Sequence, residues 1–124
     1  MKKVIATLNA PGAIGPYSQA IDCGSLVYCS GQIPVNPADG SIPDGIKAQT
    51  QQAITNVTAL LEAAGLTLDN VVKTTVFLAD MKDFQAMNEV YGQSFTAPYP
   101  ARSAVAVREL PKGVMVEIEV IAAR

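Results

Sequence analysis

Two charged residues near the end of the chain have the types and spacing of a small anion-binding site. Arg102 lies in an alternating segment at 98–107, and Glu117 lies in a second one at 114–122. Both segments are rich in β-branched residues and predict strands, and the Pro and Gly between them predict a hairpin. The planar guanidinium of an arginine can hold a carboxylate through two hydrogen bonds, so this pair of strands suggests a pocket for a small anion.

The predicted hairpin determines which side chains face each other. Every second residue of 114–120 is apolar, and the valines of the first strand are expected on the same face, because a one-residue slip would expose them. This register sets Ala104 opposite Glu117 and Arg102 opposite Glu119, with Arg102 and Glu117 on one shared face. The alternative is an ordinary cross-strand ion pair on a solvated surface, worth about 0.2 to 1 kcal/mol.

The composition narrows the class of protein. The 124 residues predict a single domain, 1–124. Charged residues make up 16% of the chain, against a typical fraction of about 25%, and hydrophobic residues make up 49%, which suggests surface buried against another subunit. No apolar run is long enough for a membrane span, and the run after Lys3 is too short for a signal peptide, so a cytoplasmic protein is expected.

Charge and missing residue types exclude several kinds of chemistry. The net charge is −2, so we expect no nucleic-acid partner. The chain has no histidine, which removes the usual general base and the commonest metal ligand, and no metal site is expected. Cys23 and Cys29 are predicted to be buried free thiols rather than a disulfide.

The remaining segments predict an α+β domain in which two helices cover one face of a mixed sheet. Strands are expected at 3–7, 19–22, 26–30 and 71–79. The first helix is expected to begin after an Asp44 cap and to stop at Gly65. Its apolar stripe should pack on the sheet, with Gln49, Gln52, Asn56 and Glu62 on the wet side.

The second helix follows a predicted Asp80 cap, with a buried stripe of Phe84, Met87, Tyr91 and Phe95. In the strand before it, alternation places Val72, Thr74, Val76 and Leu78 on one face. The face of the sheet away from the helices is expected to be buried between subunits of a cyclic oligomer.

Three further positions allow a structural or a functional interpretation. Tyr17, in the Pro- and Gly-rich loop 8–20, can cap a cleft or simply pack. Gly31 can admit a ligand close to the backbone or make a bulge. Asn88, an amide inside the apolar stripe, needs a partner, either a loop carbonyl or a ligand at a pocket edge.

Six blocks of the sequence, in order, resemble the YjgF/RidA family of reactive-intermediate deaminases over nearly the whole chain. The blocks are AIGPYSQA, VYCSGQIP, LLEAAG, VVKTTVFLADM, YPARSAV and LPKG followed by VEIE. The resemblance implies a homotrimer of the chorismate-mutase-like fold, with a central barrel and a cleft at each subunit interface. It also implies hydrolysis of 2-iminobutanoate and 2-iminopropanoate, released by pyridoxal-phosphate dehydratases, to 2-oxo acids and ammonia.

The resemblance assigns roles to residues of this chain. Arg102 resembles the substrate-carboxylate clamp, and Glu117 resembles the residue that holds the attacking water. The cleft lining implied by the family is Tyr17, Ser30, Gly31, Phe84 and Asn88. Many members have cysteine where this chain has Ala104, so only the backbone N–H remains there as a donor. Because an imine is already electrophilic, the reaction needs positioned water and proton transfer, and no cofactor is expected.

Two other classes of function use the same features differently. A 2-oxo acid sensor or chaperone-like trimer would bind its ligand in the same cleft without turnover. A nuclease, an activity sometimes ascribed to relatives of this family, is disfavoured by the acidic pI of about 4.9 and the absence of histidine.

Overall fold

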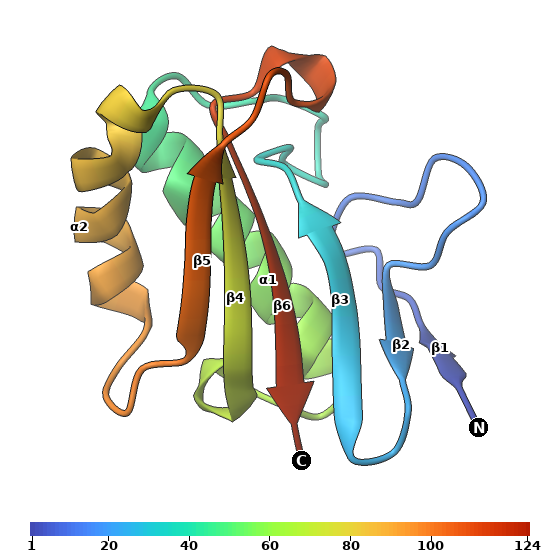
Figure 1. Cartoon of the computed structure of the whole chain (residues 1–124). Helices are drawn as coiled ribbons and strands as arrows, with labels where there is room; N and C mark the ends of the chain where they lie inside the picture. The colour runs from blue at the N-terminus through green and yellow to red at the C-terminus, as the bar shows by residue number, and fades with distance from the viewer.

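The computed structural model describes all 124 residues. It contains a six-stranded sheet and two α-helices, α1 (Ile46–Ala63) and α2 (Phe84–Ser94). The strands are β1 (Lys3–Ile5), β2 (Ala20–Asp22), β3 (Leu26–Gln32), β4 (Val71–Leu78), β5 (Ala101–Ala106) and β6 (Val116–Ala123). Both helices lie on the same side of the sheet (Figure 1), which confirms the predicted α+β class. None of the helices is long and apolar enough to cross a membrane.

The order of strands in the sheet corrects one prediction. The order is β1-β2-β3-β6-β4-β5, and the strands β2 and β3, both predicted, pair with each other in an antiparallel hairpin. The predicted hairpin of β5 and β6 is wrong, because β4 lies between them: Val76 pairs with Ala104 on one side and with Ile118 on the other. Helix α2 returns the chain so that β5 joins β4 in parallel at the sheet edge. Strand β6 then runs antiparallel between β3 and β4.

This order places Arg102 and Glu117 on opposite faces of the sheet. Residues paired across neighbouring strands point to the same side. Arg102 pairs with Thr74, which is fully buried beneath the helices, whereas Glu117 pairs with Phe77 on the open face. The prediction of one shared face is therefore wrong. The valines of the two strands were also predicted to share one face, and this is wrong too. Val105 of β5 is 46% exposed, whereas the valines of β6 are buried in the core.

Helix α1 packs on the sheet through the predicted apolar stripe. Its buried members include Ala53, Ile54, Val57, Leu60 and Leu61. Gly65 follows the helix with φ 77°, a left-handed conformation that suits glycine, as predicted. The Asp44 cap is wrong, because the helix begins after Gly45 (φ 88°) and no side chain caps it.

Two amides expected on the wet side of α1 are buried instead. Asn56 donates from Nδ2 to the carbonyls of Ile33 and Val35, both at 3.0 Å. Gln49 accepts a hydrogen bond from the backbone N–H of Met115 at 2.8 Å. These amides satisfy loop backbone that crosses the helix, which hydrophobic periodicity alone does not reveal.

Strand β4 and the turn that follows it lead into α2, and only part of this region matches the prediction. A bulge between Val71 and Lys73 buries Val71 and exposes Val72, so the predicted buried face of β4 holds only from Thr74 onward. Asp80 caps as predicted, accepting from the backbone N–H of Lys82 at 2.9 Å, although it caps a short 3-10 turn that leads into α2.

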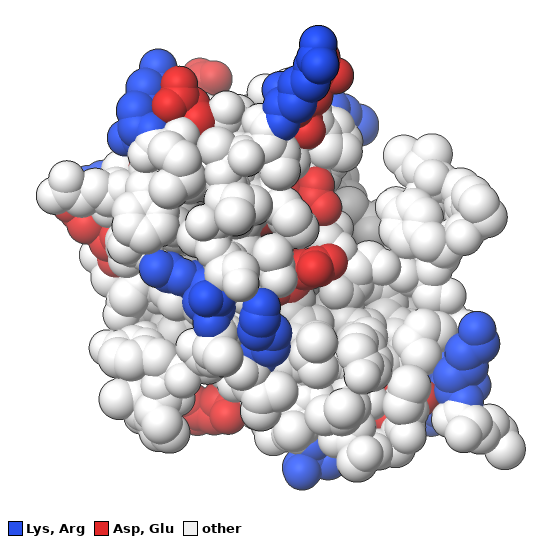
Figure 2. All heavy atoms as spheres, viewed as in Figure 1, with Lys and Arg blue, Asp and Glu red and all other residues white.

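The face of the sheet away from the helices carries both apolar and charged side chains. Figure 2 shows that most atoms on this side are uncharged, with basic and acidic groups next to each other near the middle and the other charged groups toward the edges. Tyr28 and Val105 are 44% and 46% exposed here. Large apolar side chains in this position are typical of a surface that contacts another chain, although single exposed apolar residues are common.

Candidate active site

Arg102 sits at the start of the edge strand β5, between that strand and α2. Its Nη1 donates to Oδ1 of Asn88 at 2.6 Å. Its Cζ lies 4.7 Å from the ring centroid of Tyr91 and 5.5 Å from that of Phe84. We call Phe84, Asn88, Tyr91 and Arg102 the arginine cluster. The cluster holds the guanidinium by an amide oxygen and two aromatic faces, neither of which neutralises its charge.

The positive charge of Arg102 has no carboxylate partner in the chain. The ion pairs of the structure join Lys47 to Glu89, Lys82 to Asp80 and Arg124 to Asp22. Only one of the five N–H donors of the Arg102 guanidinium has a hydrogen-bond partner. Beside it is a hollow of about 410 Å³ whose walls include Tyr99 and Pro100. An arginine with free donors at a hollow is suited to bind an anion.

Asn88 lies at the wall of the hollow beside Arg102, and of its two sequence interpretations only the bond to a loop carbonyl is wrong. Its side-chain oxygen accepts from Arg102 and bonds to no loop carbonyl, so its structural contact is with the candidate clamp itself. Phe84 and Asn88 are thus brought next to Arg102. Ala104 lies two residues further along β5 on the same face, partly buried against the core.

Glu117, in β6, lies against Gly31 of the neighbouring strand β3, on the face of the sheet opposite to Arg102. A Cβ atom built on Gly31 would be 2.0 Å from Oε2 of Glu117, so any side chain at position 31 would collide with the carboxylate. Gly31 also falls within the irregular part of β3, between Cys29 and Gln32. The glycine therefore makes room for Glu117, a close approach that the sequence predicted only for a ligand.

The carboxylate of Glu117 is half-buried and has no ion-pair or hydrogen-bond partner within the chain. Burial raises its pKa above the ordinary glutamate value, and the nearby charge of Glu119 raises it further. A carboxylate with a raised pKa and free oxygens is suited to accept a proton from water.

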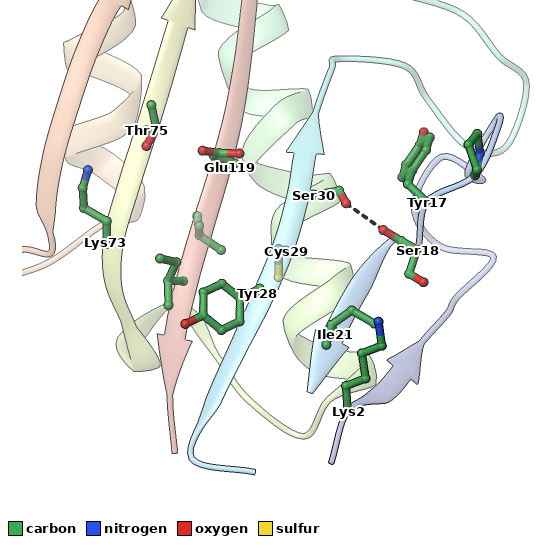
Figure 3. A pocket seen from close by; sticks show the side chains of 13 residues that line it. Lys2, Tyr17, Ser18, Ile21, Tyr28, Cys29, Ser30, Lys73, Thr75 and Glu119 are labelled. Atoms are coloured by element: carbon green, nitrogen blue, oxygen red, sulfur yellow. Dashed lines mark hydrogen bonds between the residues drawn. The ribbon is translucent and has the colours of Figure 1, made fainter. Parts of the chain in front are cut away.

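Tyr17 and Ser30 lie near Gly31 on this side of the molecule. Ser30 donates from Oγ to the carbonyl of Ser18 at 2.6 Å (Figure 3). The Tyr17 side chain is 53% exposed, and its hydroxyl accepts a hydrogen bond from the backbone N–H of Ile14 at 3.3 Å. Tyr17 therefore does not pack in the core. We call Tyr17, Ser30, Gly31 and Glu117 the glutamate cluster.

Two hollows border the glutamate cluster. One of about 460 Å³ is lined by Tyr17, Ser30, Lys73, Thr75 and Glu119, among others. The other, of about 230 Å³, is lined by Tyr17 and Gly31 together with the loop that follows β3. Within one chain the structure therefore assembles the predicted site residues into two clusters on opposite faces of the sheet.

The sequence did not identify two residues that contact the arginine cluster or belong to it. Tyr91 was predicted only as part of the buried stripe, and Thr74 only as a strand residue. They share a buried hydrogen bond of 2.8 Å between their hydroxyl groups. The available signal was the spacing of Phe84, Asn88 and Tyr91, which places all three on one helix face.

The remaining candidate ligands and nucleophiles are acidic side chains and two thiols. The structure contains no group of three or more His, Cys, Asp or Glu side chains that could hold a metal ion. Both cysteines are free; Cys29 is buried as predicted, whereas the prediction is wrong for Cys23, which is exposed at the turn after β2. Burial raises the pKa of the Cys29 thiol to about 11, so this thiol is protonated at neutral pH.

The sequence and the fold are matched by known proteins. A family profile described as Endoribonuclease L-PSP, which represents the YjgF/RidA family, matches residues 7–124. The chain belongs to this family, which confirms the resemblance found in its sequence.

Individual relatives are similar over their whole length. A 2-iminobutanoate/2-iminopropanoate deaminase of Escherichia coli is 53% identical over 127 residues, covering 100% of this chain and 99% of the relative. The structure of Escherichia coli TdcF with bound serine superposes with a TM-score of 0.96 at 51% identity, covering 98% of both chains. The structure of RidA from an Antarctic Psychrobacter superposes with a TM-score of 0.95 at 47% identity, covering 98% of this chain and 99% of that one.

Proposed function

We propose that this protein hydrolyses 2-imino acids, among them 2-iminobutanoate and 2-iminopropanoate, to 2-oxo acids and ammonia. The observation that carries the proposal is the unneutralised Arg102 guanidinium, which has free donors for a substrate carboxylate. The full-length likeness to a deaminase of that specificity supports the choice of substrate. Removing such imines would protect the cell from reactive products of pyridoxal-phosphate dehydratases.

The complete site forms between two copies of the chain in a homotrimer. Within one chain Arg102 and Glu117 point away from each other, so one substrate cannot touch both. Arg102 is on the edge strand, where a neighbouring subunit can approach it, and Glu117 is on the open face. Packing the edge of one copy against the open face of the next brings an arginine cluster to a glutamate cluster. Repeated around a threefold axis, this contact closes the ring and encloses a central barrel.

Each cluster has a separate part in the reaction. Arg102 binds the substrate carboxylate through two charge-assisted bonds, each worth about 1.5 to 3 kcal/mol. Glu117 of the adjoining copy holds a water molecule and accepts its proton as the oxygen attacks the imine carbon. That proton passes to the imine nitrogen and gives a carbinolamine. The hydroxyl proton of the carbinolamine is then transferred through the same carboxylate to the amino group, and ammonia leaves as the carbon–nitrogen bond breaks and the carbonyl forms. The backbone N–H of Ala104 is a further donor, and Tyr17 and Ser30 line the cleft.

The test is an imine-decay assay coupled to a dehydratase, on the wild type and two variants. We expect Arg102→Ala to abolish turnover and 2-oxobutanoate binding while the oligomer stays folded. We expect Glu117→Gln to retain 2-oxobutanoate binding, measured by calorimetry, and to lose rate. Near-normal turnover by Arg102→Ala would refute the clamp. Wild-type protein that binds 2-oxobutanoate but leaves imine decay unchanged would instead identify a 2-oxo acid sensor.

A further inference from the structure

Beneath Arg102 lies a second layer of contacts that involves no charge. The hydroxyl of Tyr91 shares a 2.8 Å hydrogen bond with the hydroxyl of Thr74, in the interior of the protein. Tyr91 is 6% exposed and Thr74 is fully buried, so neither hydroxyl has ready access to water. The ring of Tyr91 also stacks on Phe95, with 4.4 Å between ring centroids. Tyr91 is therefore held at its hydroxyl and along its ring.

Thr74 and Tyr91 both lie next to Arg102, one in the neighbouring strand and the other in α2. Thr74 is the cross-strand partner of Arg102 in the pairing of β4 with β5. Tyr91 reaches from α2 and places its ring 4.7 Å from the guanidinium carbon. The contacts thus form a closed circuit from Arg102 through the strand to Thr74, through the hydroxyl pair to Tyr91, and through the ring back to Arg102.

Such a circuit matters because an arginine on an edge strand is flexible. Its side chain carries up to about 2 kcal/mol of rotamer entropy, which binding has to overcome unless the protein has already fixed it. The hydrogen bond to Asn88 fixes one nitrogen, and of the two rings beside the guanidinium the ring of Tyr91 is nearer, at 4.7 Å against 5.5 Å for Phe84. A ring face beside the guanidinium restricts the plane, and the Thr74 hydroxyl fixes the ring.

We infer that Tyr91, fixed by Thr74, is a positioning residue that sets the plane of the Arg102 guanidinium for a two-oxygen carboxylate ligand. The inference rests on the proposed function, because it assumes that Arg102 binds the substrate carboxylate. Thr74 is fully buried and Tyr91 is 6% exposed, so both residues act through Arg102. Their effect is on affinity for a planar carboxylate, and proton transfer by Glu117 is unaffected.

The alternative is that Tyr91 and Thr74 only pack the core. A matched control separates the two, because the chain has a second fully buried threonine, Thr50, whose hydroxyl donates to the carbonyl of Ile46 at 2.7 Å within α1. Thr74→Val and Thr50→Val remove the same hydroxyl from equally buried sites. Only the first is connected to Arg102. Tyr91→Phe removes the same hydrogen bond from its other end and keeps the ring.

The experiment measures KM and kcat for imine hydrolysis, and calorimetric Kd for 2-oxobutanoate and for its uncharged amide. For Thr74→Val and for Tyr91→Phe we expect KM and the 2-oxobutanoate Kd to rise about three-fold to ten-fold, the range that loss of one hydrogen bond gives. We expect kcat and amide binding to stay within about two-fold, because the amide lacks a carboxylate for the guanidinium plane to match. The double variant is expected to match either single variant, because all three lose the same bond.

Two outcomes would overturn the inference. One is that Thr74→Val and Tyr91→Phe bind 2-oxobutanoate as Thr50→Val does; the other is that acid and amide weaken equally. Arg102→Ala tells this failure apart from failure of the proposed function. If Arg102→Ala binds 2-oxobutanoate normally, the proposed clamp is wrong. If it loses binding while the Thr74 and Tyr91 variants retain it, only the positioning role is wrong.

Discussion

Mixing two inactive variants tests directly whether the site is shared between copies. Arg102→Ala lacks the clamp but keeps Glu117, and Glu117→Gln has the opposite defect. The two residues lie on opposite faces of the sheet, so in the proposed homotrimer each cleft takes its arginine from one copy and its glutamate from another. In an oligomer assembled from both variants, some clefts therefore receive two intact residues.

The size of the expected recovery follows from this geometry. With equal amounts and random assembly, a cleft is intact only when its arginine comes from the Glu117 variant and its glutamate comes from the Arg102 variant. Both conditions hold in about a quarter of the clefts of a closed ring. We therefore expect the mixed sample to recover about a quarter of the wild-type kcat, with an unchanged KM.

The assay follows imine decay after the two variants have been unfolded and refolded together, with different tags to prove that mixed oligomers form. The matched control mixes Arg102→Ala with the double variant Arg102→Ala/Glu117→Gln, where no cleft can have an arginine. If mixed oligomers are isolated and their activity does not exceed that of the separate variants, the shared site is refuted. If instead both residues acted within one chain, mixing the two variants would restore no activity, because every chain would lack one of them.

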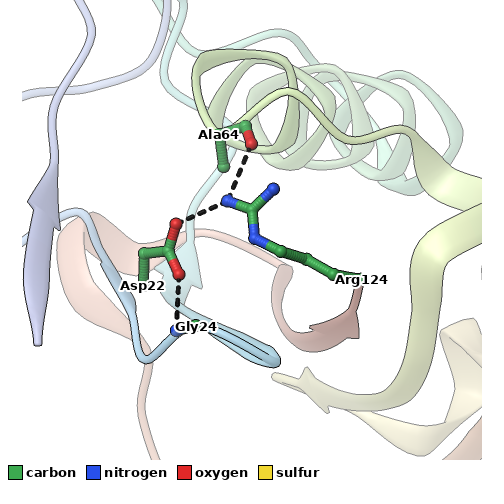
Figure 4. Close-up of polar contacts among 4 residues, drawn as sticks. All are labelled: Asp22, Gly24, Ala64 and Arg124. Atoms are coloured by element: carbon green, nitrogen blue, oxygen red, sulfur yellow. Dashed lines mark hydrogen bonds and ion pairs between the residues drawn. The ribbon is translucent and has the colours of Figure 1, made fainter. Parts of the chain in front are cut away.

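Four other predictions follow from the geometry. Gly31→Ala is expected to displace the Glu117 carboxylate and lower kcat at least about ten-fold, with little added loss in a Gly31→Ala/Glu117→Gln double variant, as steady-state kinetics would show. Because burial raises the pKa of Glu117, kcat/KM should fall in acid with an apparent pKa above the ordinary value of about 4.3; a lower value would mean that the charge of Arg102 outweighs burial. Asp22 binds the backbone N–H of Gly24 and the guanidinium of Arg124, and these hydrogen bonds lower the pKa of Asp22 (Figure 4). Asp22→Asn should therefore lower Tm at neutral pH, and the difference should vanish as pH falls below the ordinary aspartate value of about 3.9 and through the lowered pKa, with no difference at neutral pH contradicting the ion pair. RNA incubated with purified protein should remain intact, and cleavage that is lost in Arg102→Ala would contradict this.

The elements of the fold were predictable from the sequence, but their neighbours in the sheet were not. Alternation in 98–107 and 114–122 correctly indicates two strands and the buried face of the second. It contains no information about which strand lies beside which. The parallel pairing of β4 with β5 depends on the return path through α2. The error in that one pairing moved Arg102 to the wrong face.

Local exceptions to periodicity explain the smaller errors. The bulge in β4 exchanges the roles of Val71 and Val72, because one extra residue reverses the alternation. Asn56 and Gln49 are buried on α1 because loop backbone far away in sequence needs hydrogen-bond partners. Neither feature has a signal in the sequence near those residues. The resemblance to the family named the candidate site residues as the lining of one cleft and did not indicate that they lie on two faces of the sheet.

The separation of Arg102 from Glu117 has a consequence for how such a site is maintained. A guanidinium and a carboxylate on the same face of one sheet would pair with each other, and the substrate would have to break that pair before binding. Here neither group has a charged partner within its own chain. Arg102 contacts the Asn88 amide and aromatic rings, and Glu117 occupies the space that the missing side chain of Gly31 leaves. The sheet keeps the two charges of one chain apart. In the proposed homotrimer, the two charges face each other across the subunit interface, and a gap wide enough for one small 2-imino acid leaves both groups free to act on it.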